Sequence, residues 1–195
     1  HDYAATIAAV AEMVRALEQT AHGTGSIGIG MPGSLSPASG LVQNANSTWL
    51  NGRPLARDLA GRLGPRVRLA NDANCFALSE AVDGAGGGFD RVLGVILGTG
   101  CGGGIVVGRR IMDGPRGIGG EWGHNPLPWS RADEWPGPAC WCGRRGCMEA
   151  WVCGPALAAD HERVTGEVAD ALTVSRRASV SAAPARSDRQ RCTSI

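Results

Sequence analysis

The chain has 195 residues, of which 19 are arginine and none is lysine, and 18 acidic residues leave a formal net charge of +1. Without lysine the chain cannot form a GK[ST] phosphate loop, a kinase-type strand lysine or a Schiff base. A balance this close to neutral argues against a dedicated nucleic-acid binder, which needs a basic surface. With 43% apolar residues, the chain can bury one large core or two small ones.

Neither a membrane span nor a secretion signal is visible in the sequence. The longest uncharged stretch, 92–108, holds seven glycines among its 17 residues, whereas a membrane helix needs about 20 mostly apolar residues. We therefore expect a cytoplasmic chain that binds neither membrane nor nucleic acid. In a reducing cytosol, clustered cysteines favour metal binding over disulfides.

The first half of the chain predicts alternating helices and strands. Apolar residues at helical spacing predict a helix over 3–20, and apolar alternation over 26–31 predicts a short buried strand. Residues 33–54, rich in Ser, Asn and Gly, predict a long loop, which inside a compact domain is usually functional. A short amphipathic helix over 55–63, a strand around 67–69 and a helix over about 73–83 follow.

The second half predicts a further α/β unit, which begins with a strand over 91–97, a glycine turn over 98–104 and a strand over 105–111. We assign residues 1–88 to one α/β lobe and 89–165 to part of a second lobe with a metal site. The tail 166–195 carries five arginines and no sustained apolar period. We predict that this tail is disordered.

One imidazole and three thiols form the strongest chemical signal in the sequence. They belong to His124, Cys140, Cys142 and Cys147, with three cysteines inside eight residues. Four soft or borderline donors are what a closed tetrahedral zinc site needs, and the glycines between the last two cysteines permit tight turns. The alternative is three reduced core thiols beside a surface histidine, but the clustering favours zinc.

Asn71 and Asp72 stand at the predicted end of a strand, just before a helix. Strand ends at a crevice are where α/β proteins place catalytic groups, and Asp72 could accept a proton there. Asp is also a good helix N-cap, so a purely structural role remains open for Asp72 at this point.

Two further segments suit ligand contacts. The turn that contains Gly98, Thr99 and Gly100 could close backbone N–H groups on phosphate oxygens, although glycine-rich hairpin turns without a ligand are common. Glu121 and His124, beside a tryptophan and joined by Glu149, would suit a polyhydroxylated ligand. The alternative for both acids is a solvated surface carboxylate.

Taken together, these segments resemble the repressor–ORF–kinase (ROK) family. G-E-W-G-H-N-P-L-P at 120–128, followed by C-x-C-G-x-x-G-C-x-E at 140–149, is similar to the family signature, and L-A-N-D-A-N-C at 69–75 and I-L-G-T-G at 96–100 match its catalytic and phosphate segments. N-A-N-S-T-W-L-N-G at 44–52 is most similar to bacterial fructokinases of the manno(fructo)kinase kind. The resemblance covers about residues 1–165 and implies an α/β, actin-like (ribonuclease-H-type) fold of two lobes.

The resemblance implies ATP-dependent phosphorylation of a hexose, D-fructose or D-mannose, at its 6-hydroxyl, with Asp72 as the general base and Mg²⁺ neutralising phosphate charge. It implies that Gly98, Thr99 and Gly100 contact phosphate, and that zinc is structural while its ligand His124 also meets a sugar hydroxyl. A homodimer is usual for the family. The residues implied to hold sugar hydroxyls are Asn46, Asn71, Glu121, His124 and Glu149.

The chain also departs from the family pattern. The D-x-G-G-T-K phosphate loop does not occur, and nothing after about residue 165 matches the family. We therefore expect a fold incomplete at both ends, from truncation or a frameshift, in a chain that folds marginally and transfers phosphate poorly or not at all. The alternatives are a sugar-responsive transcriptional repressor of the same family, which often lacks Asp72 and the Gly98–Gly100 pattern, and a non-catalytic sugar-binding remnant.

Overall fold

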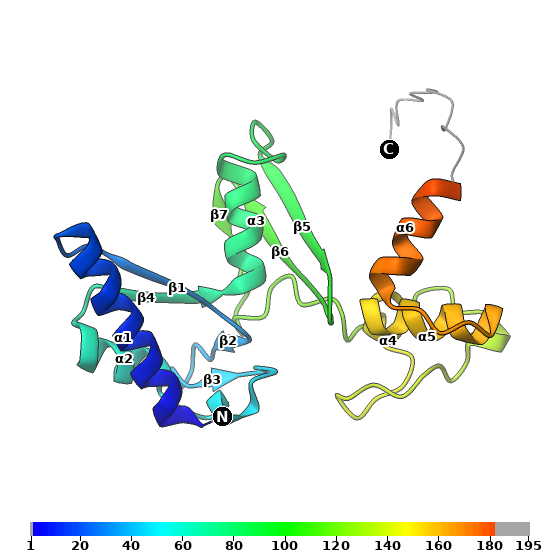
Figure 1. Ribbon diagram of the computed structural model, residues 1–195, viewed down its shortest axis with the longest axis horizontal. Helices are drawn as coiled ribbons and strands as arrows, with labels where there is room; N and C mark the ends of the chain where they lie inside the picture. The colour runs from blue at the N-terminus through cyan, green and yellow to red at the C-terminus, as the bar shows by residue number, and fades with distance from the viewer. Residues whose placement is uncertain (1, 182–195) are drawn as a thin grey trace. The chain divides into compact units, whose positions relative to one another are not determined.

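The computed structural model describes residues 2–181, which form two compact units (Figure 1). Unit 1 comprises the chain up to residue 96 together with 102–122, and unit 2 comprises 97–101 and the chain from 123 onward. Most of the two strands that we assigned to the second lobe therefore belongs to unit 1. Among the described residues, no helix combines the length and apolar composition needed to cross a bilayer.

Unit 1 begins with a parallel strand pair covered by helices. Helix α1 (Tyr3–Ala21) leads into β1 (Ile27–Met31), which pairs with β4 (Val67–Asn71) so that Met31 lies opposite Asn71. Helix α2 (Leu55–Leu63) stands between the two strands in sequence. The predicted helices and strands are confirmed here, and Asp2 caps α1 by accepting a hydrogen bond from the Ala5 N–H at 2.7 Å.

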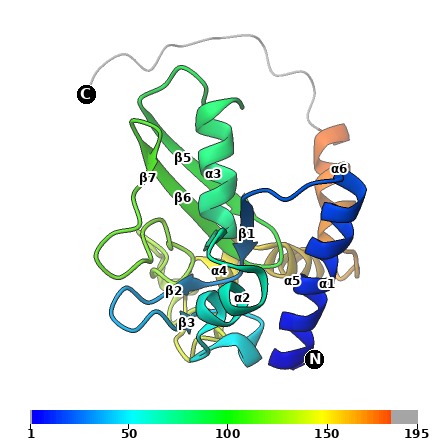
Figure 2. The same ribbon diagram turned by 90° about the vertical axis from the view of Figure 1, so that its left-hand side faces the viewer.

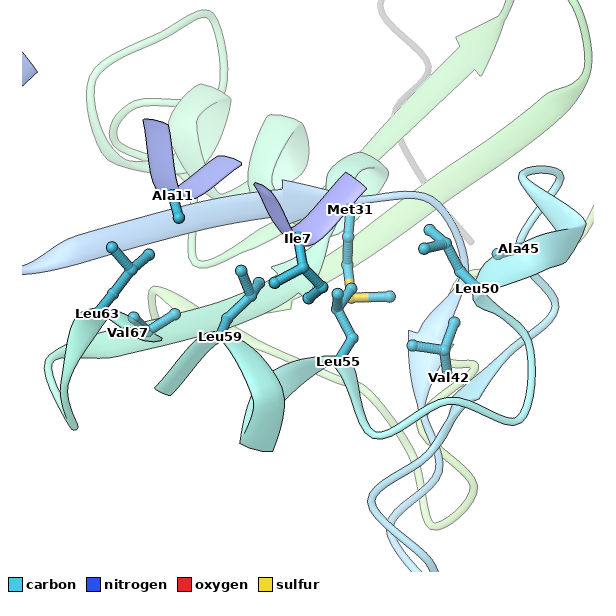
Figure 3. Close-up of a cluster of buried hydrophobic side chains, with 10 residues drawn as sticks. All are labelled: Ile7, Ala11, Met31, Val42, Ala45, Leu50, Leu55, Leu59, Leu63 and Val67. Carbon is cyan, nitrogen blue, oxygen red and sulfur yellow. The ribbon is translucent and has the colours of Figure 1, made fainter. Parts of the chain in front are cut away.

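Apolar side chains from these elements and from residues 42–50 form one buried cluster, which Figure 3 shows. Leu59 of α2 lies at its centre and is 1% exposed. The cluster joins α1 and α2 to the strand pair and fixes the position at which β4 ends. Its buried members are Ile7, Ala11, Met31, Val42, Ala45, Leu50, Leu55, Leu59, Leu63 and Val67.

The long predicted loop over 33–54 is partly regular. It contains the antiparallel pair β2 (Ser34–Leu35) and β3 (Val42–Gln43), and a 3₁₀ turn, η1 (Thr48–Leu50). The Asn51 amide replaces backbone pairing next to this turn, because it accepts from the Ala45 N–H and donates to the Ala45 carbonyl, both at 2.9 Å. The polar composition of this segment contains no apolar pattern from which the two strands and the 3₁₀ turn could be predicted.

The remainder of unit 1 is a helix on a small sheet. Helix α3 (Asp72–Val82) lies on the sheet of β5 (Arg91–Leu97), β6 (Cys101–Val107) and β7 (Arg110–Ile111), as both ribbon views show (Figures 1 and 2). A Cβ on Gly94 or on Gly104 would lie 2.7 Å from the Cβ of Ala77, far inside the ~3.5–4.0 Å of carbon contacts. Residues 102–104 are therefore strand glycines, of which Gly104 admits the helix, and β6 begins at Cys101 instead of residue 105.

The described residues of unit 2 form the 3₁₀ turn η2 (Ala132–Glu134) and the helices α4 (Glu149–Val152), α5 (Gly154–Thr165) and α6 (Ala171–Ser181). Helix α6 lies in the tail that we predicted to be disordered. It begins after Asp170, whose carboxylate accepts from the Thr173 N–H at 2.7 Å, and Arg177 contacts Glu167 at 2.8 Å. Residues 182–195 of the predicted tail lie outside the described residues.

The Tyr3 hydroxyl of α1 donates to the Asp58 carboxylate of α2 at 2.8 Å, and burial raises the pKa of Tyr3 from 10.0 to about 12. We expect Tyr3→Phe to lower the free energy of unfolding by about 0.5–1.5 kcal/mol at pH 7. Because the phenol ionises more readily in the unfolded chain, this difference should shrink as the pH rises from 10 toward 12. Urea unfolding of both proteins at several pH values measures it, and a difference that stays constant would contradict the link.

Candidate functional site

The junction of β4 and α3 carries the candidate base. Asn71 is the N-cap of α3, since its Oδ1 accepts from the Asn74 N–H at 3.0 Å, and its Nδ2 donates to the Gly33 carbonyl at 2.9 Å. The capping role that the sequence left open for Asp72 therefore belongs to its neighbour. Both functions of the Asn71 amide hold the strand, the helix and the turn after β1 together.

Asp72 is the first residue of α3, and its side chain is exposed. Its Oδ1 accepts from the Ala73 N–H at 2.8 Å and from Asn71 Nδ2 at 3.3 Å. These two donors orient the carboxylate through one oxygen, and Oδ2 faces no hydrogen-bond donor of the described residues. The arrangement suits a group that accepts a proton from a ligand.

Asn46 and Glu121 are the other predicted site residues of unit 1, and both are exposed. Asn46 follows Ala45, whose backbone is held on both sides by the Asn51 amide. Glu121 precedes Trp122, whose indole N–H donates to the Gly102 carbonyl of β6 at 2.8 Å. Each side chain thus extends from backbone that hydrogen bonds hold in place.

Asn74 was not predicted as a site residue. It is 5% exposed, and its Nδ2 donates to Asp113 Oδ1 at 2.8 Å, which ties the segment after β7 to the first turn of α3. Asn74 follows the N-cap Asn71 by three residues, and this spacing is the sequence signal that could have indicated a buried, hydrogen-bonded Asn74.

The turn between β5 and β6 holds the predicted phosphate contacts in unit 2. Its backbone is partly committed to the protein, because the Gly98 N–H donates to the Gly100 carbonyl at 2.9 Å and the Gly98 carbonyl accepts from the Gly154 N–H at 2.7 Å. The Cys101 N–H donates to Glu149 at 2.9 Å. Thr99, which is exposed, and the Gly100 amide are the donors that remain in the described turn for a ligand.

Unit 2 brings the four predicted metal ligands together. The ligand atoms of His124, Cys140, Cys142 and Cys147 lie within 4.8 Å of one another. His124 Nδ1 lies 3.5 Å from Cys140 Sγ, and Cys142 Sγ lies 3.7 Å from Cys147 Sγ. Burial raises the pKa of the Cys147 thiol to about 12. Bringing this thiol to the thiolate form therefore requires a compensating positive charge.

Backbone hydrogen bonds between two segments bring these ligands into register. The Glu149 N–H donates to the Gly123 carbonyl at 2.8 Å, and the Met148 N–H donates to the Asn125 carbonyl at 2.9 Å. These bonds place His124 beside Cys147, and the Cys140 N–H closes a tight turn onto the Arg144 carbonyl at 2.8 Å. Distant parts of the sequence thus converge without a regular sheet.

Glu149 is buried, and both of its carboxylate oxygens have partners. Oε2 accepts from the Cys101 N–H at 2.9 Å, and Oε1 accepts from the Trp141 indole N–H at 2.5 Å. The sequence did not point to Trp141, which stands between two of the thiols, because an exposed aromatic residue in a loop carries no periodic signal. The structure thus gathers the thiols, His124 and Glu149 in unit 2, whereas Asn46, Asn71, Asp72 and Glu121 belong to unit 1.

Comparison with known proteins gives one family. The sequence model of the ROK family matches residues 1–194 of the chain. The match runs through the tail, so the expectation that the resemblance ends near residue 165 is wrong.

Two curated relatives are N-acetylhexosamine kinases. An N-acetylgalactosamine kinase of Shewanella sp. (strain ANA-3) is 40% identical over 171 residues, which are 87% of this chain and 55% of the relative. An N-acetyl-D-glucosamine kinase of Pectobacterium atrosepticum is 39% identical over 180 residues, 90% of this chain and 59% of the relative. The chain therefore spans just over half the length of these relatives, and neither is named a fructokinase.

Solved structures share the fold. A ROK hexokinase of Thermus thermophilus superposes with a TM-score of 0.75 at 34% identity, covering 93% of this chain and 59% of that one. A ROK glucokinase of Streptomyces griseus, solved with glucose and AMPPNP, gives a TM-score of 0.66 at 30% identity, covering 85% and 52%. The expected α/β, actin-like fold class is confirmed.

The two bonds of the Asn71 amide predict a stability effect at the β4–α3 junction. We expect Asn71→Ala to lower the free energy of unfolding by about 1–3 kcal/mol, because the cap of α3 and the donor to Gly33 are both lost. Asn71→Asp keeps the capping acceptor and should recover part of that loss. Urea unfolding of the three proteins measures the difference, and equal stability of wild type and Asn71→Ala would contradict the assigned cap.

Proposed function

The chain belongs to the ROK family, and from this membership we propose that it serves the ATP-dependent phosphorylation of an N-acetylhexosamine at its 6-hydroxyl. The observation that carries the proposal is the exposed Asp72 carboxylate, oriented at the first turn of α3 by donors to one oxygen only. The names of the two curated relatives favour an N-acetylhexosamine over the fructose that the loop resemblance suggested.

In the proposed reaction, Asp72 acts as the general base. Its Oδ2 accepts the proton of the sugar hydroxyl as the hydroxyl oxygen forms a bond to the γ-phosphorus of ATP and the bond to the β,γ-bridging oxygen breaks, releasing ADP. The bonds from Ala73 and Asn71 to Oδ1 orient the carboxylate and leave Oδ2 for the sugar hydroxyl. Asn46, Asn71 and Glu121 would orient the sugar hydroxyls from unit 1.

The phosphate side of the proposal rests on the turn after β5. The Thr99 hydroxyl and the Gly100 amide would donate to phosphate oxygens, while Glu149 fixes the turn through Cys101. Mg²⁺, when bound, would neutralise charge on the transferred group, which no lysine of this chain can do.

We also propose that His124, Cys140, Cys142 and Cys147 hold one structural zinc ion. A tetrahedral site with bonds of about 2.3 Å to sulfur and about 2.1 Å to nitrogen has S–S edges of about 3.8 Å and S–N edges of about 3.6 Å. The 3.7 Å and 3.5 Å separations fit these edges. Since the nitrogen beside Cys140 is Nδ1, His124 would keep Nε2 for a sugar hydroxyl.

The proposal for Asp72 is tested by Asp72→Asn in the whole chain. We expect the rate of phosphoryl transfer from ATP to N-acetylglucosamine to fall about 10²–10⁴-fold relative to wild type, because Asn cannot take the proton. Calorimetric binding of the sugar should change little, since the amide keeps the size of the side chain. A coupled ADP-release assay measures the rate.

Asp83→Asn is the matched control, because Asp83 is an exposed aspartate at the opposite end of the same helix. Its rate should equal that of wild type. Equal rates in wild type and Asp72→Asn would contradict the base role. Sugar binding by a wild-type chain that shows no transfer at all would favour the non-catalytic sugar-binding alternative.

The zinc proposal predicts one zinc ion per purified chain by mass spectrometry of the metal. Cys147→Ser should lose the ion and unfold at a lower temperature, because structural zinc contributes directly to folding. Cys75→Ser should keep the ion, since Cys75 is exposed and lies outside the ligand group. A cooperatively folded wild-type chain purified without zinc would contradict the proposal.

A further inference from the structure

Trp141 contacts two unit 2 side chains: His124, to which the proposed function assigns a sugar hydroxyl, and Glu149, which the family resemblance implies as a second sugar contact. Its indole N–H donates to Glu149 Oε1 at 2.5 Å. Its ring meets the His124 imidazole edge to face, with centroids 4.8 Å apart and planes at 77°. Trp141 itself stands between Cys140 and Cys142 in the sequence.

The residue is 71% exposed, which is unusual for an indole whose N–H reaches a buried carboxylate. Burial of an apolar ring does not explain its place, because most of the ring faces solvent. Trp141 instead supplies an N–H group that is directed at Glu149 and an aromatic ring that contacts His124.

Glu149 is held from two directions as a result. The Cys101 N–H binds Oε2, and a Cβ on Gly100 would lie 2.6 Å from the same oxygen, so the carboxylate fills the space beside the turn after β5. The Trp141 N–H binds the other oxygen. Without it, the side chain keeps one hydrogen bond and gains freedom to rotate about its terminal torsion.

We propose that Trp141 is a positioning residue of the sugar site, whose indole N–H orients the Glu149 carboxylate and whose ring fixes the His124 imidazole. Trp141 thereby links the loop that carries Cys140 and Cys142 to the side chains of His124 and Glu149. The inference rests on the proposed function, because it concerns how the sugar contacts of that function are arranged. Trp141 itself makes no contact with reacting atoms.

The first test is Trp141→Phe, which keeps one aromatic ring but loses the five-membered ring of the indole and with it the N–H. We expect the calorimetric Kd for N-acetylglucosamine to rise about tenfold, the loss expected when one charge-assisted hydrogen bond no longer orients a binding group. The zinc content should stay that of wild type. Trp129→Phe is the control, because Trp129 is a 95% exposed tryptophan of the same unit.

The second test needs no sugar. In ¹⁵N-tryptophan-labelled protein, the indole resonance absent from Trp141→Phe is that of Trp141. We expect it to lie downfield and to exchange slowly with water although its ring is exposed, because the N–H is bound to a carboxylate. Glu149→Gln should move it upfield and speed its exchange.

The outcomes separate the two proposals. A fast-exchanging, unshifted indole resonance, loss of zinc in Trp141→Phe, or wild-type sugar affinity in that variant would each overturn the positioning role. A shifted, protected resonance in a wild-type chain that binds no N-acetylhexosamine would instead contradict the proposed function and leave the orientation of Glu149 by Trp141 supported.

Discussion

The close approach of α3 to its sheet is the contact on which the arrangement of unit 1 depends. Ala77 lies against Gly94 of β5 and Gly104 of β6, and it is fully buried. Any larger side chain at these three positions would push the helix away from the strands. Asp72 is the first residue of that helix, five residues before Ala77, so the packing contact lies about 7.5 Å along the helix from it, at about 1.5 Å per residue, and fixes where its carboxylate stands.

Unit 2 uses a different principle, in which polar bonds and a metal-ligand group replace an apolar core. The segments that contain His124 and Cys147 are aligned by a short series of backbone hydrogen bonds, and the Glu149 side chain links them to the turn after β5. Short segments of this kind lack the buried apolar area that stabilises a sheet. The proposed zinc ion would supply that missing stabilisation.

Much of the fold could be predicted from the sequence, because α1, β1, α2, β4 and α3 carry regular apolar spacing. The glycine run from 102 to 104 could not, since glycine has no apolar period and the role of Gly104 depends on Ala77 facing it from another element. Helix α6 was missed for a related reason. It depends on the Asp170 cap and on the ion pair between Arg177 and Glu167, not on an apolar stripe.

The candidate site divides in the same way. The grouping of His124, Cys140, Cys142 and Cys147 was predictable, because donor type and spacing alone point to one candidate metal site. The roles of Asn71 and Asp72 were not separable, because either residue can cap a helix and only the bond to Asn74 distinguishes them. The role proposed for Trp141 could not be predicted from the sequence. It depends on one N–H group, whose partner Glu149 is eight residues further along the chain.

The boundary between β4 and α3 contains no connecting residue, since the strand ends at Asn71 and the helix begins at Asp72. A hinge requires at least a few residues whose backbone angles can change, and here there are none. Asp72 therefore shares the stiffness of the paired strands behind it. A ligand that binds beside it has little backbone to order, so the entropic cost of arranging this carboxylate is borne during folding and not during each binding event.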